Sequence, residues 1–244
     1  MRIQHLVNLS HHNTFGFPVI AEECITIESE KDALELHKTG FFKLPHRILG
    51  GGSNVLFTKN AIPKVLLNRI EGINIIEESD ENIRIQFGAG MTWHAVVEHA
   101  VNNGWGGIEN LSLIPGSIGA APIQNIGAYG VELKDTFHSL TALNFETGNI
   151  DHFSHSECKF GYRDSIFKRS HKGKYLITSV TLDLQKKPAI NTQYGDIQQV
   201  LNQKNISDPS IKDVSEAVLE ISCSKLPNPK LIGNAASFCR NPGV

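Results

Sequence analysis

The sequence lacks any long hydrophobic run, and this absence excludes an obvious membrane span. No apolar run approaches the ~18 to 20 residues that a transmembrane helix needs, and the opening MRIQHLVNLSHHNTFG contains no long apolar signal core. The formal net charge of -2 provides no basic excess for nucleic acid. Basic residues are also neither clustered nor interleaved with aromatic residues. We therefore expect a cytoplasmic, monomeric protein with neither nucleic-acid nor membrane partners.

Cysteine is scarce, and its spacing excludes the common cysteine-based sites. The four cysteines lie far apart without a CxxC pair, which fits neither a zinc site nor a compact disulfide framework. We expect free thiols. Eleven histidines are present, but His11 and His12 are adjacent, and the separation of His94 from His99 is a poor helical spacing for chelation. We expect no bound metal.

Common nucleotide and nucleophile motifs are also absent. The run Gly50-Gly51-Gly52-Ser53-Asn54 fails the GxGxxG pattern because Val55 occupies the last glycine position, and no GK[ST] sequence makes a Walker loop. Three glycines before two hydrogen-bonding side chains could nevertheless expose backbone N–H groups to a phosphate. A simple hairpin turn explains the same run equally well. Both interpretations stay open on the residues alone.

The most unusual segment of the chain is IPGSIGAAPIQNIGAYG, residues 114–130, which we call the shelf. It has four glycines, three alanines, two prolines and no Asp, Glu, Lys or Arg. Small side chains let a backbone approach a flat or polar ligand closely, and the prolines fix the path of the chain. A buried loop between elements is the plainer alternative. The length of the segment favours a binding surface.

Periodicity predicts an α+β fold without a regular βαβ rhythm. A length of 244 residues allows one large domain or two modest ones, with a weakly indicated boundary at 68–72. Neither repeats nor low-complexity segments are present. Capping residues and apolar spacing predict helices near 29–40, 92–104 and 214–221. Alternation predicts strands at 47–57 and 65–70 around the glycine turn, and at 83–87, 139–145 and 175–184.

Two polar residues stand in contexts typical of catalytic sites. Arg163 lies between Tyr162 and Asp164 in the run FGYRDSIFK. A surface ion pair with Asp164 is one explanation, and bidentate binding of a substrate carboxylate is the other. Ser237 follows small residues in GNAAS without a GxSxG elbow. It is either a serine bonded to backbone or a proton donor.

Taken together, GGGSNVLF, the shelf, FGYRDSIFK, and KLPNP followed by GNAASFCRNP resemble the UDP-N-acetylenolpyruvoylglucosamine reductases, flavoenzymes of peptidoglycan precursor synthesis. The order and approximate spacing also match, from Asn13 to Pro242. The run Gln193-Tyr194-Gly195-Asp196 resembles the subtype with a tyrosine loop.

The resemblance implies an FAD-binding pair of α+β subdomains of the vanillyl-alcohol-oxidase type, at 1–70 and 71–210, and the start of a substrate-binding domain at 211–244. It implies that NADPH reduces FAD, which then reduces the enolpyruvyl UDP-sugar, UDP-N-acetylglucosamine enolpyruvate. Arg163 resembles the family's carboxylate-stabilising arginine and Ser237 its proton donor. The implied substrate-binding residues are Tyr162, Tyr194, Lys225 and Asn241. The implied cofactor-binding residues are Gly50, Gly51, Gly52, Ser53, Asn54, Pro115, Gly116, Ser117, Gly119, Ala120, Asn125, Gly127, Ala128 and Tyr129.

The match to the family pattern has gaps. Ser222 and Cys223 replace basic residues, and Ala236 replaces the glycine that usually precedes the catalytic serine. The family's sequence continues beyond the position of Val244, and its catalytic glutamate belongs to that continuation. We therefore expect an FAD-dependent reductase whose activity in this chain is open, with a non-catalytic FAD-binding fragment or a degenerate remnant as the alternative.

Overall fold

The structure is a computed structural model that describes residues 1–225, 227 and 231–235. The α-helices are α1 (Glu30–Lys38), α2 (Trp93–Asn102), α3 (His155–Cys158), α4 (Gly195–Gln203) and α5 (Ile211–Lys225). The strands are β1 (Arg2–Asn8), β2 (Ile20–Ile27), β3 (Arg47–Leu49), β4 (Ala61–Asn68), β5 (Ile73–Glu78), β6 (Asn82–Gly88), β7 (Gly127–Ala128), β8 (Val131–Glu132), β9 (Phe137–Asn144), β10 (Ile150–Ser154) and β11 (Tyr175–Gln185).

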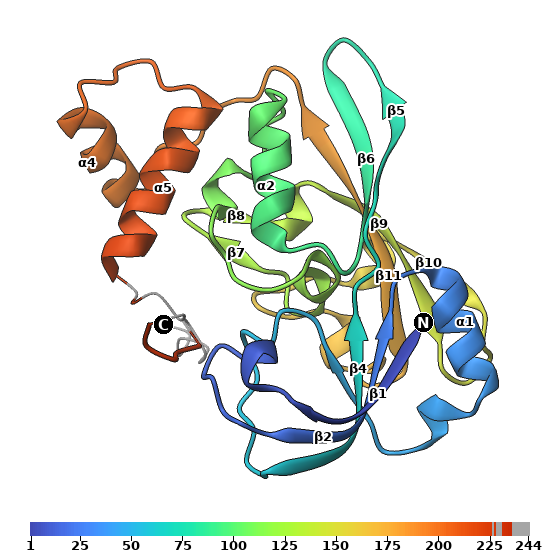
Figure 1. Cartoon of the computed structure of the whole chain (residues 1–244). Helices are drawn as coiled ribbons and strands as arrows, with labels where there is room; N and C mark the ends of the chain where they lie inside the picture. Colours follow the sequence, from blue (N-terminus) through green and yellow to red (C-terminus); the bar gives the residue numbers. More distant parts are fainter. Residues whose placement is uncertain (226, 228–230, 236–244) are drawn as a thin grey trace.

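Two β-sheets form the framework of the fold (Figure 1). The first sheet has the order β1-β2-β4-β3, in which β2, β4 and β3 are parallel and the edge strand β1 is antiparallel to β2. The second sheet has the order β10-β9-β11-β6-β5 and is entirely antiparallel. Strands β7 and β8 make a separate small hairpin at residues 127–132. This architecture confirms the predicted α+β class.

Helix α1 begins where the sequence predicts and joins the two sheets. The Ser29 hydroxyl accepts from the backbone N–H of Asp32 at 3.1 Å and caps the helix. Its buried face, Ala33 and Leu36, shares one hydrophobic cluster with Ile25 of the first sheet and Leu143 of the second. The helix therefore excludes water from the junction of the sheets.

Helix α2 and the shelf cover the second sheet. The hydroxyl of Thr92 caps α2 by accepting from the N–H of Ala95 at 3.3 Å, as predicted. Trp93 is fully buried, and its indole N–H donates to the carbonyl of Leu111 at 2.9 Å. Ile118 and Ile126 of the shelf belong to the same core cluster as Trp93. The shelf is thus anchored from below by apolar side chains.

The prediction of two strands around a glycine turn is confirmed for the two strands, β3 and β4, and is wrong for the turn between them. Strands β3 and β4 are parallel neighbours, so residues 50–60 form a connection between them and not a hairpin. Residues 55–57 are irregular. The sequence pattern reports only neighbouring residues, whereas β4 also pairs with β2, which lies far away in the chain. Pairing with β2 fixes the direction of β4 in a parallel sheet.

Helices α4 and α5 pack on each other beside α2 (Figure 1). The helix α5 was predicted from its apolar spacing, and α4 was not. A buried hydrogen bond of 2.8 Å between the hydroxyls of Ser112 and Ser215 ties α5 to the loop before the shelf. Among the helices of the part of the chain that the structure describes, none is long and apolar enough to span a membrane.

Candidate functional site

The glycine loop, residues 50–54, lies against the shelf on one side and the N-terminal loop on the other. A Cβ atom on Gly51 would lie 3.0 Å from the Cα of Gly116. Gly52 has a left-handed φ of +65°, and a Cβ there would lie 1.9 Å from the carbonyl oxygen of His12. Because side chains cannot occupy these spaces, both positions need glycine. The loop therefore follows one path, set by backbone contacts.

The backbone of the glycine loop offers hydrogen-bond donors to a ligand. Within residues 1–225, the N–H groups of 51–54 donate to no protein acceptor. Polar backbone groups need partners when a site closes over them. Consecutive unpaired N–H groups bind anions, and a phosphate matches such a cradle. The glycine loop therefore fits the diphosphate of a dinucleotide, and the hairpin interpretation is excluded.

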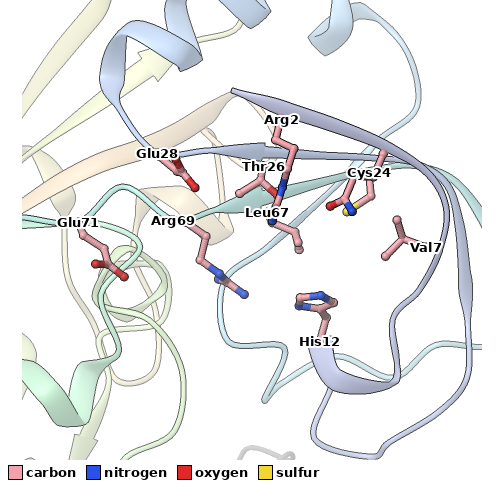
Figure 2. Close-up of a pocket in the computed structure, with 10 residues that line it drawn as sticks. Arg2, Val7, His12, Cys24, Thr26, Glu28, Leu67, Arg69 and Glu71 are labelled. Carbon is pink, nitrogen blue, oxygen red and sulfur yellow. The ribbon is translucent and has the colours of Figure 1, made fainter.

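Two adjoining cavities extend from the glycine loop. The first, of about 420 Å³, lies between Gly51, Gly90 and Ser117. The second, of about 520 Å³, lies over the first sheet, and Figure 2 shows side chains that line it. Arg69 and Glu71 line both cavities. The two volumes are in the range of small-molecule sites.

The shelf presents its predicted cofactor residues in two groups. Gly116 and Ser117 lie next to the glycine loop, where Pro115 is exposed and Ser117 is buried. A 3-10 helix, Ile118–Ile123, then turns the backbone, with Ala120 exposed on it and Gly119 packed against Ala89. The second group begins at Asn125 and continues through β7. Gly127, Ala128 and Tyr129 belong to this second group.

Arg163 lies at the tip of a tight turn that is fastened to the shelf. Gly161 and Asp164 exchange backbone hydrogen bonds of 3.0 and 3.2 Å, and Arg163 has a left-handed φ of 52°. The buried side chain of Asn125 donates to the carbonyl of Gly161 at 3.0 Å. Ser165 donates from its hydroxyl to the carbonyl of Ile123 at 2.8 Å. The turn and the shelf therefore form one unit.

The interpretation of Arg163 and Asp164 as a surface ion pair is wrong. The carboxylate of Asp164 pairs with Arg169 at 3.1 Å. Up to Lys225, no acidic side chain pairs with the half-buried Arg163, whose carbonyl accepts from Lys168. A guanidinium without an internal partner retains its fork of donors for an external carboxylate.

At the end of the second shelf group, Tyr129 meets residues from two distant parts of the chain, one beside α4 and one on α5. The rings of Tyr129 and Tyr194 meet edge to face with centroids 5.4 Å apart. The hydroxyl of Tyr129 lies 3.4 Å from that of Ser222 on α5. Lys225, at the end of α5, forms an ion pair with Asp196. The hydrogen bond that the ammonium donates to this carboxylate raises the pKa of Lys225.

Not every predicted residue can be placed, and some lining residues were not predicted. Ser237 and Asn241 lie outside the residues that the structure describes. Arg69 and His12 line the cavity of about 520 Å³ without having been predicted. Burial, and then the nearby charge of Arg69, lowers the pKa of His12. An arginine directly after a buried strand was the available signal for Arg69.

Comparisons with known proteins first define the class of the fold. A family model described as FAD binding domain matches residues 25–154. The UDP-N-acetylenolpyruvylglucosamine reductase of Thermus caldophilus has a TM-score of 0.62 at 20% identity, covering 93% of this chain and 96% of that one. The 6-hydroxy-D-nicotine oxidase of Arthrobacter nicotinovorans has a TM-score of 0.54 at 16% identity, covering 77% and 42%. The chain has the FAD-binding fold of the vanillyl-alcohol-oxidase class.

Sequence relatives then define the family. The UDP-N-acetylenolpyruvoylglucosamine reductase of Flavobacterium johnsoniae is 46% identical over 99% of this chain and 72% of its own length. The enzyme of that name from Pseudomonas fluorescens is 42% identical over 100% of this chain and 72% of its own length. The chain therefore belongs to the UDP-N-acetylenolpyruvoylglucosamine reductase family, whose members are FAD-dependent oxidoreductases.

Proposed function

We propose that the chain binds FAD and uses NADPH to reduce UDP-N-acetylglucosamine enolpyruvate to UDP-N-acetylmuramate. One observation carries the proposal: the glycine loop packs on Gly116 of the shelf, and the turn that carries Arg163, which has no ion-pair partner within residues 1–225, is hydrogen-bonded to Asn125 of the same shelf. A cradle for a diphosphate and a cation for a carboxylate thus lie on one support. Relatives at 42–46% identity carry the name of this reductase.

The cofactor half of the site consists mainly of backbone. We assign the glycine loop to the FAD diphosphate and the two shelf groups to the remainder of the cofactor, with Ser117 and Asn125 held by burial. When bound, FAD would supply the hydride-transfer chemistry between NADPH and the enolpyruvyl methylene carbon. Because the Arg163 turn is hydrogen-bonded to the shelf, the residues assigned to the cofactor and the catalytic arginine belong to one linked unit. The proposed FAD-binding subdomains are 1–70 and 71–210.

The catalytic half of the site stabilises negative charge and donates a proton. Hydride addition to the methylene carbon leaves negative charge on the neighbouring carbon and on its carboxylate. Arg163 stabilises that charge by forked hydrogen bonds, which are strong when both partners are ionised. Ser237 donates a proton to the same neighbouring carbon, by resemblance to the family. General acid catalysis of this kind contributes about 100- to 10,000-fold.

The nucleotide end of the substrate requires a different surface. We assign its diphosphate to Lys225 and Tyr194, whose side chains are exposed and lie near Tyr129. Tyr162, exposed at the Arg163 turn, and Asn241 complete the proposed contacts. Residues 211–244 then begin the substrate-binding domain.

Anaerobic flavin spectroscopy tests the proposal. The purified chain is loaded with FAD, reduced by NADPH, and mixed with the enolpyruvyl UDP-sugar. We expect NADPH to bleach the flavin absorbance and the sugar to restore it. UDP-N-acetylglucosamine, which lacks the enolpyruvyl group, is the matched control and should restore nothing.

The outcomes separate the alternatives. Bleaching without recovery supports a non-catalytic FAD-binding chain. Recovery with both sugars contradicts the substrate assignment. Failure to retain any flavin contradicts the cofactor assignment, and with it the proposal.

A further inference from the structure

Arg69 lies directly after β4, at the boundary between the two cavities. Its backbone N–H donates to the carbonyl of Ile27 at 2.9 Å, which continues the contact between β4 and β2. Its backbone also packs so closely on Gly90 that a Cβ on that glycine would lie 2.5 Å from it. The start of the side chain is therefore fixed by β2 of the first sheet and by the connection between β6 and α2.

The half-buried side chain of Arg69 reaches back to the glycine loop. The Nη1 atom donates to the carbonyl of Gly50 at 3.0 Å and to that of Asn68 at 3.1 Å. These two bonds use the donors of one terminal nitrogen only. In the stretch 1–225, Nε and Nη2 donate to no protein acceptor, which leaves three N–H groups available.

The surroundings of Arg69 leave its charge available to a ligand. In Figure 2 the guanidinium extends toward the ring of His12, and no carboxylate within residues 1–225 forms an ion pair with it. Glu71, exposed, lines the same two cavities. Because Nη1 already contacts the carbonyl of Gly50, an anion held by the glycine loop would lie close to the remaining donors of Arg69.

We propose that Arg69 positions the glycine loop through Gly50 and donates from its remaining N–H groups to a phosphate of the bound cofactor. This inference rests on the proposed FAD binding and adds a side-chain cation to a cradle otherwise made of backbone. A charge-assisted hydrogen bond is about twice as strong as a neutral one. Arg69 should therefore contribute to affinity for phosphorylated flavins and not to affinity for the flavin ring.

The test compares FAD with riboflavin, which lacks both phosphates, using quenching of flavin fluorescence. We expect R69Q to weaken FAD binding by roughly 10- to 100-fold and to leave riboflavin affinity within about twofold of the unmodified chain. R47Q is the matched control. Arg47 is exposed on β3 and donates only to the neighbouring carbonyl of His46, so this variant should bind FAD normally.

A conservative variant separates charge from geometry. R69K retains the positive charge and loses the fork, so its FAD affinity should fall by roughly 3- to 10-fold. Added salt should weaken FAD binding by the unmodified chain more than by R69Q, because a charge contact is screened. If far-UV circular dichroism finds R69Q unfolded, the FAD affinity of R69K relative to the unmodified chain decides whether Arg69 contributes to FAD binding.

Three outcomes would overturn the inference. FAD binding by R69Q within twofold of the unmodified chain removes the role of Arg69, and the same result for R69K does so if R69Q is unfolded. An equal loss for FAD and riboflavin indicates a general structural role instead. Absence of FAD binding by the unmodified chain overturns the proposed function together with the inference. The first two outcomes leave FAD binding by the unmodified chain intact, so the two kinds of failure can be told apart.

Discussion

The side-chain amide of Asn125 bridges the shelf and the Arg163 turn. Its Nδ2 donates to the carbonyl of Gly161 at 3.0 Å, while its Oδ1 accepts from the backbone N–H of Lys134 at 3.0 Å. The side chain is completely buried, and the residue has a left-handed φ of 44°, which asparagine tolerates better than most residues. One amide therefore fixes the distance between the predicted flavin surface and the predicted catalytic arginine.

Replacing Asn125 by alanine should destabilise the protein by about 1–3 kcal/mol, because the half-buried carbonyl of Gly161 and the half-buried N–H of Lys134 both lose their partner. Urea denaturation of the purified variant measures this loss. N103A is the control, since Asn103 is exposed and donates to His99 within its own helix end. A loss for N125A no greater than for N103A would show that the bridge contributes nothing.

Replacing Arg163 by glutamine should separate the two half-reactions. Removing a donor to developing negative charge costs about 100- to 1,000-fold, so recovery of the flavin absorbance by the enolpyruvyl sugar should slow by that factor. Bleaching by NADPH should stay within about twofold. Stability should change little, since the side chain is half-buried without an ion pair up to Lys225. K172Q, exposed nearby, is the control. Equal slowing of both steps would contradict the assigned role.

Features determined by residues close in the chain could be predicted from the sequence, whereas features determined by distant residues could not. The cap of α1 by Ser29 was predictable because the hydroxyl bonds a residue three positions away. The parallel neighbours of β4 were not, because β2 lies 41 residues earlier at the Glu23 and Lys64 pair. That strand partner decided that the glycine loop is a connection and not a hairpin.

The candidate site divides along the same line. Composition alone indicated the shelf, because small residues without charge are unusual over such a length. The ion-pair partner of Asp164 is Arg169 and not the adjacent Arg163, and this choice depends on how the turn folds. Arg69 was missed because its importance comes from the meeting of two cavities, a property of tertiary structure.

The ion pair of Lys225 predicts competition at the nucleotide end of the site. Both Lys225 and Asp196 are exposed, and a substrate diphosphate would have to displace the carboxylate from the ammonium. D196N should therefore bind UDP roughly 2- to 5-fold more tightly at low salt, since an exposed pair is weak. Isothermal titration measures the change, with D208N as a control on an exposed loop. Weaker binding by D196N would instead mean that Asp196 holds Lys225 in its binding position.

Asp32 should make stability depend on pH. Hydrogen bonding from the backbone N–H of Glu28, with the N-terminal ammonium 2.9 Å away, lowers the pKa of this carboxyl. A lowered folded-state pKa means that the stabilisation is present above the unfolded value, roughly pH 3.9, and is lost as pH falls through the folded value. Between about pH 5 and pH 2, the unfolding free energy of D32N should therefore fall less steeply than that of the unmodified chain. Identical slopes would exclude Asp32 as a contributor.

The thiols should differ sharply in reactivity. Burial raises the pKa of Cys158 to about 12, and burial also raises the pKa of Cys24, against the opposing charges of Arg2 and Arg69. The thiolate is the reactive form, so at pH 8 both should resist iodoacetamide in the folded protein. Cys223 is exposed and, of the three cysteines that the structure describes, should react first. Mass mapping of alkylated peptides measures this order, and urea should abolish the difference. Rapid labelling of Cys158 without urea would mean that the core around α3 opens far more often than the complete burial of Cys158 implies.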